Sequence, residues 1–175
     1  AILGPLRSVS AYTAISGRQR VNTRVGAPLF EQNYELEVPN VLVAAMQYES
    51  GVLGTLHMNS DSILDERTSL EIYGTDGIVL MGDPNQFGAP VYLQKTNAEP
   101  VAFPLTHGFA ANSRGLGAAE MAWSIRAGRN HRASKEMAYH VFETMHGIML
   151  SAKTGAAHAM ASTFATPAAL PEGYI

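Results

Sequence analysis

The sequence contains no cysteine, and this absence excludes several kinds of site at once. Thiolate catalysis, cysteine-ligated zinc and iron–sulfur clusters all need cysteine side chains. A chain without disulfides is compatible with a reducing compartment, so we take the cytoplasm as the expected location. With 175 residues, of which 46% are hydrophobic, the chain is long enough to bury a core without such cross-links.

The chain also lacks a long apolar run and an excess of positive charge. No stretch reaches the roughly 18 consecutive apolar residues of a membrane-spanning helix. The N-terminus has neither the basic block nor the apolar block of a signal peptide. Twelve Lys and Arg against fifteen Asp and Glu give a formal net charge of −3, which disfavours binding to a phosphate backbone. We therefore expect neither a membrane nor a nucleic acid as a partner.

The first two thirds of the chain show the patterns of β-strands and tight turns. Side chains alternate between two unlike sets along the first run, and glycine-containing turns separate the later runs. The connection at residues 17–34 is polar and contains Gly and Pro, which predicts a long surface loop. The expected strands are 6–15, 36–47, 52–59, 68–73, 78–81, 91–95 and 101–103.

The last third changes to helical spacing. Apolar residues recur three and four positions apart after Ser134, a good N-cap, until a basic last turn that is followed by Gly155. A shorter helix is predicted over residues 115–127, ending at a glycine. Residues 156–175 are rich in Ala, Ser, Thr and Pro and predict an extended tail after a domain at residues 1–155.

Strands first and helices last predict an α+β fold. We expect a mainly antiparallel, open-faced sheet of about six or seven strands with the helices packed on one face. The other face would still carry apolar side chains, and exposed apolar patches usually bind a partner. Self-association across this face, as a dimer or tetramer, is the expected use.

Three short motifs suggest chemistry but lack its full requirements. The segment GLGAAE, from Gly115 to Glu120, starts like the dinucleotide fingerprint G-x-G-x-x-G, but a polar loop precedes it and Glu120 replaces the small third residue. Glu143 and His146 have a Glu-x-x-His spacing, yet di-iron bundles need that pair twice plus two further Glu. No G-x-S-x-G elbow surrounds Ser60. We therefore predict no dinucleotide site, no metal centre and no hydrolase.

Two polar loops remain as candidate binding sites. The first follows the second hairpin arm at residues 59–62 and continues to Asp65 and Arg67. The second precedes the helix at 115–127, where backbone N–H groups favour an anion or a polyol oxygen. It contains His107, Asn112 and Arg114. Loops that are merely solvated have the same composition, and that alternative stays open.

The order and spacing of these segments resemble a known family. The runs LEIYGTDGIVLMGDPNQFGAPVYLQ and PLTHGFAANSRGLGAAEMAWSIRAGRNHRAS, with the helix KEMAYHVFETMHGIMLSAKTG, carry the resemblance. They resemble the C-terminal domain of the Gfo/Idh/MocA oxidoreductases, a family that includes glucose-fructose oxidoreductase and inositol dehydrogenase. The resemblance covers the chain from Leu3 to Tyr174.

This resemblance implies an enzyme that oxidises a sugar or polyol, or reduces the corresponding carbonyl, with NAD or NADP. It implies that an N-terminal Rossmann domain, absent from this chain, holds the cofactor and that the open sheet face builds the oligomer. Substrate contacts would come from Asp65, Arg67, His107, Asn112 and Arg114, and the main acid/base group would lie upstream of Ala1.

We therefore expect no catalytic residue in this segment and no activity from it alone. Two alternatives stay open: a module that binds another protein through the sheet face, and a non-catalytic, sugar-sensing relative.

Overall fold

The computed structural model describes residues 2–61, 69–111 and 113–171. They form antiparallel strands and two helices, which confirms the predicted α+β class. The ten described strands belong to two four-stranded sheets and a two-stranded ribbon, whereas the sequence predicted one sheet. The described residues divide into two compact units. The first unit contains residues 2–61 and 133–167, and the second contains residues 69–132, without 112, and 168–171.

The elements of the first unit are β1 (Leu6–Ala14), β2 (Gln19–Val21), β3 (Asn33–Glu35), β4 (Val41–Tyr48), β5 (Leu53–Asn59), α2 (Lys135–Thr154) and β10 (His158–Ala159). Those of the second unit are β6 (Leu70–Tyr73), β7 (Ile78–Met81), β8 (Val91–Gln94), β9 (Val101–Phe103) and α1 (Leu116–Arg126). No helix in the described ranges is both long enough and apolar enough to cross a membrane.

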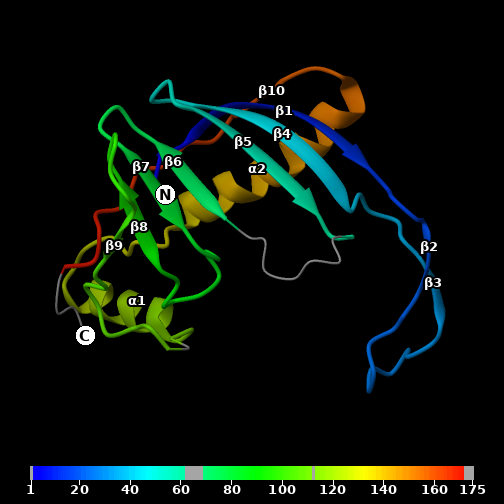
Figure 1. Ribbon diagram of the computed structural model, residues 1–175, viewed down its shortest axis with the longest axis horizontal. Coiled ribbons are helices and arrows are strands. Elements are labelled where there is room, and N and C mark those ends of the chain that lie inside the picture. Colours follow the sequence, from blue (N-terminus) through cyan, green and yellow to red (C-terminus); the bar gives the residue numbers. More distant parts are fainter. Residues whose placement is uncertain (1, 62–68, 112, 172–175) are drawn as a thin grey trace. The chain divides into compact units, whose positions relative to one another are not determined.

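The core of the first unit lies between its sheet and α2. The strands are antiparallel in the order β10-β1-β4-β5, and α2 runs across one face of this sheet (Figure 1). Val9 and Ala11 of β1, Ala44 of β4 and Ile148 of α2 form the buried cluster. Small side chains at two of these four positions let the helix approach the sheet closely.

Side chains of α2 also satisfy the free edge of β1. The short strand β10 pairs only with Ser8 and Val9, so the N–H groups on either side of this pair need other acceptors. The Leu6 N–H donates to His140 Nε2 at 2.9 Å, and the Ala11 N–H donates to Ser151 Oγ at 3.0 Å. Polar side chains on the buried face of α2 thereby complete the sheet.

On the opposite face of this sheet, no described helix of the first unit is packed. The register places Tyr12 of β1, Val43 of β4 and His57 of β5 in one row across it. Tyr12 is 83% exposed and Val43 is 50% exposed, while Leu53, at the other end of β5, is 76% exposed. The open face expected from the sequence is therefore present on this sheet.

Residues 17–34 are more ordered than the sequence predicts. They include β2 and continue into β3, and these two strands form an antiparallel ribbon (Figure 1). The next strand starts at Val41, whereas the sequence predicted a start at Leu36. Pro39 has no N–H to donate to a neighbouring strand, and the Asn40 side chain makes hydrogen bonds to residues outside the sheet. Asn40 is buried, accepts the Ser16 N–H at 2.8 Å and donates to Asp61 at 2.8 Å.

The capping residues of α2 match the sequence prediction. The Ser134 hydroxyl accepts the Met137 N–H, and Gly155 closes the helix with a φ of 70°, in the left-handed region that glycine tolerates best. The N-cap oxygen satisfies one of the N–H groups that a helix leaves without partners at its start.

The second unit contains an antiparallel sheet in the order β6-β7-β8-β9 and the helix α1. The tight turn predicted at Asp76–Gly77 joins β6 to β7, with the Gly74 N–H donating to the Gly77 carbonyl at 2.9 Å. The buried positions of α1 are polar, Glu120 and Ser124, whereas Ile125 is 75% exposed. This helix is therefore anchored by a polar network, described below.

Candidate substrate-binding site

A cavity of about 370 Å³ opens between two loops of the second unit. One loop, residues 82–90, joins β7 to β8, and the other runs from the end of β9 to α1. This volume lies in the lower part of the roughly 300–1,000 Å³ range of small-molecule sites. The lining residues are Asn85, Gln86, Phe87, Gly88, Ala110, Ala111 and Arg114.

The two loops touch at Gly88. A Cβ atom at this position would lie 2.8 Å from the Ala110 carbonyl oxygen, which is closer than side chains and backbone normally approach. Glycine therefore permits the contact that closes one wall of the cavity.

Backbone and side-chain hydrogen bonds fix the shape of the 82–90 loop. The Gly82 N–H donates to the Pro90 carbonyl at 3.1 Å, which closes the loop at its base. The Asp83 carboxylate accepts the Asn85 N–H at 2.9 Å, and the main-chain carbonyl of Asp83 accepts the Gln86 N–H at 3.1 Å. This Asx turn presents the side chains of residues 85–87 at the cavity.

Arg114 supplies the positive charge of the cavity. It is exposed, and no hydrogen bond or ion pair to another described residue holds its guanidinium. Among the described residues, no acidic side chain lines the cavity. A guanidinium that faces an open cavity can bind a carboxylate or phosphate through two parallel hydrogen bonds.

His107 is described and does not line this cavity. His107 stacks on Phe109 with ring centroids 5.5 Å apart, and its Nδ1 is buried without a hydrogen-bond partner in the described part of the chain. Asp65, Arg67 and Asn112 lie outside the described residues. A substrate contact by any of these residues stays a prediction.

The sequence reading missed Asn85, Gln86 and Phe87. The available signal was the length of the segment GDPNQFGAP, which is longer than a tight hairpin turn between two strands. That length alone does not show that a second loop packs beside it.

The polar residues after β5 have a structural role where they are described. Asp61 pairs with Arg20 at 2.6 Å and accepts the Asn40 amide. The hydrogen bond from Arg20 is the main cause that lowers the pKa of Asp61 below its usual value. This carboxylate ties the base of the β2–β3 ribbon to the end of β5.

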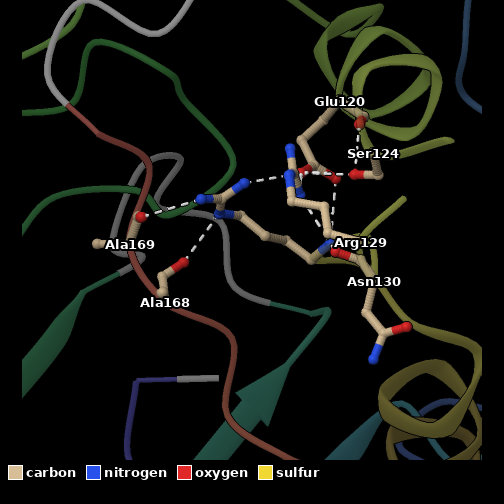
Figure 2. A network of polar contacts seen from close by, with 7 residues as sticks. Glu120, Ser124, Arg129, Asn130, Ala168 and Ala169 are labelled. Atoms are coloured by element: carbon tan, nitrogen blue, oxygen red, sulfur yellow. Dashed lines mark hydrogen bonds and ion pairs between the residues drawn. The ribbon is translucent and has the colours of Figure 1, made fainter. Parts of the chain in front are cut away.

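A second network surrounds Glu120 of α1 and includes the loop that follows this helix (Figure 2). Glu120 is buried, and its Oε1 lies 2.7 Å from both the Arg129 and the Arg132 guanidinium. Arg132 also donates to the carbonyls of Ala168 and Ala169, at 2.9 and 3.3 Å. The network therefore fastens α1, the 129–132 loop and residues 168–169 of the tail to one another.

The charge of Glu120 is stabilised by these contacts. Burial alone would raise the pKa of this carboxyl group. Hydrogen bonds from the Arg132 N–H, the two guanidinium groups and Ser124 outweigh burial and hold the pKa at about 2.

These contacts also bear on whether the chain could bind a dinucleotide. In GLGAAE the helix follows a loop rather than a strand, and the third fingerprint position, Glu120, is a buried carboxylate. The fingerprint needs a small residue at this third position so that the helix packs closely on the strand before it. The described residues do not fit a nicotinamide cofactor at this segment.

A third network, in the first unit, joins α2 to the tail. The Glu143 carboxylate accepts the N–H groups of Ala161 and Ser162 at 2.7 and 2.9 Å, and it also accepts the Ser162 hydroxyl. The bond from Ala161 is the main cause that lowers the pKa of Glu143 to about 2.

Ser162, His140 and Glu143 do not form a nucleophile set. His140 Nε2 accepts the Leu6 N–H, so the ring proton is on Nδ1 and points to the Ser162 carbonyl and hydroxyl, at 2.9 and 3.0 Å. The ring cannot take the serine proton in this arrangement. Within the described ranges, no group of three or more His, Asp or Glu side chains is placed to hold a metal ion.

No protein-family model matches the chain, and no curated protein sequence matches it. Solved structures do match. A levoglucosan dehydrogenase matches with a TM-score of 0.70 and 14% identity over 91% of this chain and 47% of that chain. The aldose-aldose oxidoreductase from Caulobacter crescentus matches with a TM-score of 0.67 and 13% identity, covering 90% of this chain and 42% of that chain. The WlbA dehydrogenase from Bordetella pertussis matches with a TM-score of 0.57 and 19% identity, over 90% and 41% of the two chains.

The chain has the fold of these oxidoreductases. This likeness confirms the fold that the sequence resemblance implies. The chain spans less than half the length of each of the three structures, between 41% and 47%.

Proposed function

We propose that this chain is the C-terminal, substrate-binding and oligomerisation domain of an NAD(P)-dependent oxidoreductase that acts on a sugar or polyol. The observation that carries the proposal is the match of about 90% of this chain to less than half of each neighbouring oxidoreductase. The remaining half of such an enzyme would hold the cofactor.

The molecules bound by the neighbours support a sugar-like substrate. Levoglucosan dehydrogenase has been solved with NADH and L-sorbose, and the aldose-aldose oxidoreductase with glycerol. The WlbA dehydrogenase has been solved with NADH and UDP-GlcNAcA. We propose the same classes of substrate and cofactor for the intact protein, with the cytoplasm as its location.

In this proposal the chain contributes binding rather than proton or hydride transfer. Arg114 lines the substrate cavity, and the exposed face of the β10-β1-β4-β5 sheet joins protein copies. Asp65, Arg67, His107 and Asn112 are proposed as further substrate contacts.

The test is an assay of the 175-residue chain beside the polypeptide encoded by the complete reading frame. With a panel of sugars and polyols, the longer polypeptide should form NADH or NADPH and the chain alone should form none. Turnover by the chain alone would contradict this division of roles. A reading frame without a dinucleotide-binding unit would instead support the alternative of a protein-binding or sugar-sensing module.

A further inference from the structure

We infer that the cavity between the 82–90 loop and the loop before α1 binds the anionic group of a small hydroxylated ligand, such as a sugar acid or a sugar phosphate. The inference deepens the proposed function and rests on it in treating this cavity as part of the substrate site.

The charge of the lining favours an anion. Of the residues that the structure describes, Arg114 is the one cation in the lining, and none of them places a carboxylate there. The nearest acid in the loop sequence is Asp83, whose Oδ1 accepts the Asn85 N–H within the Asx turn. A carboxylate or phosphate accepts two parallel hydrogen bonds from the Arg114 guanidinium and also carries the opposite charge, which a neutral sugar lacks.

The uncharged lining favours a hydroxylated ring. The side-chain amides of Asn85 and Gln86 make no hydrogen bond to another described residue, so their donors and acceptors can bind hydroxyl groups. Phe87 is 42% exposed and offers an apolar surface beside them. A few placed polar groups next to an aromatic ring are typical of small-ligand sites.

Contacts of the 82–90 loop hold its backbone in position before a ligand binds. The hydrogen bond between Gly82 and Pro90 and the Asx turn fix one loop, and the contact at Gly88 fixes its distance from Ala110. A site whose groups are already placed loses less conformational entropy on binding. Such a site binds more tightly than a flexible loop of the same composition.

The binding test compares three ligands that share one sugar ring: glucuronate, glucose 6-phosphate and glucose. Each is titrated into the 175-residue chain, and binding is followed by calorimetry and amide chemical shifts. We expect at least one anionic sugar to bind about tenfold more tightly than glucose, because a hydrogen bond to a charged group contributes at least that much. Preference for glucuronate or for glucose 6-phosphate identifies the anion as carboxylate or phosphate. Equal binding of all three, or no binding, would overturn the inference.

The matched variants are Arg114→Gln and Arg126→Gln. Arg126 belongs to the same unit, but its guanidinium lies over the Trp123 ring, 5.3 Å from the centroid, and does not line the cavity. We expect R114Q to lower the affinity for the anionic sugar by about tenfold or more and R126Q to leave this affinity unchanged. An equal loss in both variants would show a general charge effect and overturn the inference.

A second variant keeps the test valid if R114Q does not fold. Phe87→Ala leaves the Arg114 charge in place and removes the apolar surface. It should lower the affinity for the anionic sugar, and the amide chemical-shift changes on binding should still map to residues 85–88. An unchanged affinity in F87A would contradict the site.

Failure of this inference and failure of the proposed function are distinguishable. Nicotinamide reduction by the complete polypeptide with neutral sugars only would overturn the anionic site and leave the oxidoreductase assignment in place. Binding of an anionic sugar at Arg114 in a protein without nicotinamide activity would support the site and contradict the enzyme.

Discussion

At the scale of single residues, two carboxylates with a strongly lowered pKa organise the fold rather than carry out chemistry. Glu120 and Glu143 both have a pKa lowered to about 2. Each holds backbone or side-chain donors that come from the C-terminal tail or from the loop before α2. Sequence spacing suggested a fingerprint position for the first and a metal-ligand pair for the second, but their partners come from distant parts of the chain.

Replacing Glu120 by glutamine should destabilise the second unit. The change leaves Arg129 and Arg132 facing a neutral side chain. The side chains of these two residues are 35% and 22% exposed, so we expect a loss of about 2 kcal/mol in the free energy of unfolding, below the roughly 3–5 kcal/mol for a fully buried pair. Urea denaturation followed by the fluorescence of Trp123, the single tryptophan, measures it. The control E136Q, at an exposed position of α2, should change stability by about 0.5 kcal/mol or less. Equal effects of the two variants would contradict the prediction.

The same carboxylates predict how stability depends on pH. Their pKa is about 2 in the folded chain and 4.5 as the unperturbed value, so folding is favoured by the ionised form. Their contribution is complete above about pH 4.5 and is lost as the pH falls toward 2. The urea midpoint should therefore fall over this range in the parent chain and fall less steeply in E120Q. The same slope in both proteins would show that Glu120 does not cause it.

At the scale of elements, the two helices show what sequence alone can predict. The ends of α2 follow from local signals, a serine N-cap and a C-terminal glycine, because these act through bonds within a few residues. The buried face of α1 could not be predicted from apolar spacing, because it consists of Glu120 and Ser124. Its partner Arg132 reaches the tail 36 residues later, and no periodic pattern records such a contact.

The N-cap of α2 provides a direct test of this local signal. Ser134→Ala removes the oxygen that accepts the Met137 N–H, and we expect a loss of about 1 kcal/mol in unfolding free energy. Ser134→Asp keeps an acceptor and places a negative charge at the positive end of the helix dipole, so it should retain the stability of the parent chain. Chemical denaturation followed by circular dichroism measures both. A destabilised S134D together with a stable S134A would contradict the cap.

Two helical glycines should respond in opposite directions to the same substitution. At Gly117 of α1 an added Cβ would have no atom within 4 Å, so Gly117→Ala should add about 1 kcal/mol through helix propensity. At Gly147 of α2 a Cβ would lie 2.5 Å from His158 Cδ2, so Gly147→Ala should lower stability by about 1–3 kcal/mol. Thermal and urea denaturation measure the stability of both variants relative to the parent chain.

A double variant identifies the cause of the loss at Gly147. His158→Ala removes the ring that the added methyl group would meet, so G147A should be less harmful in the H158A background than in the parent chain. Additive effects of the two changes would show that contact with the His158 ring is not responsible.

At the scale of the whole molecule, the fold class was predictable and the division of the strands was not. Alternation, turn residues and helical spacing indicate antiparallel strands followed by helices, and the described chain has them. Sheet membership depends on pairing between distant strands, such as β10 with β1, which the sequence pattern does not encode. The cavity was missed for a similar reason, since its lining joins residues 85–88 to Ala110, Ala111 and Arg114, and the two loops touch at Gly88.

The exposed face of the β10-β1-β4-β5 sheet predicts self-association of the whole molecule. Val43 is half exposed in the middle of this face, between Tyr12 and His57. Two copies packed face to face would bury this row of side chains. A charge placed in the row would lose its hydration there without gaining an ion-pair partner, which disfavours association. We expect the parent chain to sediment as a dimer or tetramer at micromolar concentration and Val43→Glu to sediment as a monomer.

The control for this prediction is Ile125→Glu, which adds the same charge at a side chain that is 75% exposed on α1. It should keep the oligomer of the parent chain, because α1 is not part of the sheet face. Circular dichroism establishes that both variants are folded. A monomeric parent chain would refute association through this face. Dissociation by I125E as readily as by V43E would instead indicate net charge, because like charges repel wherever they lie on the surface.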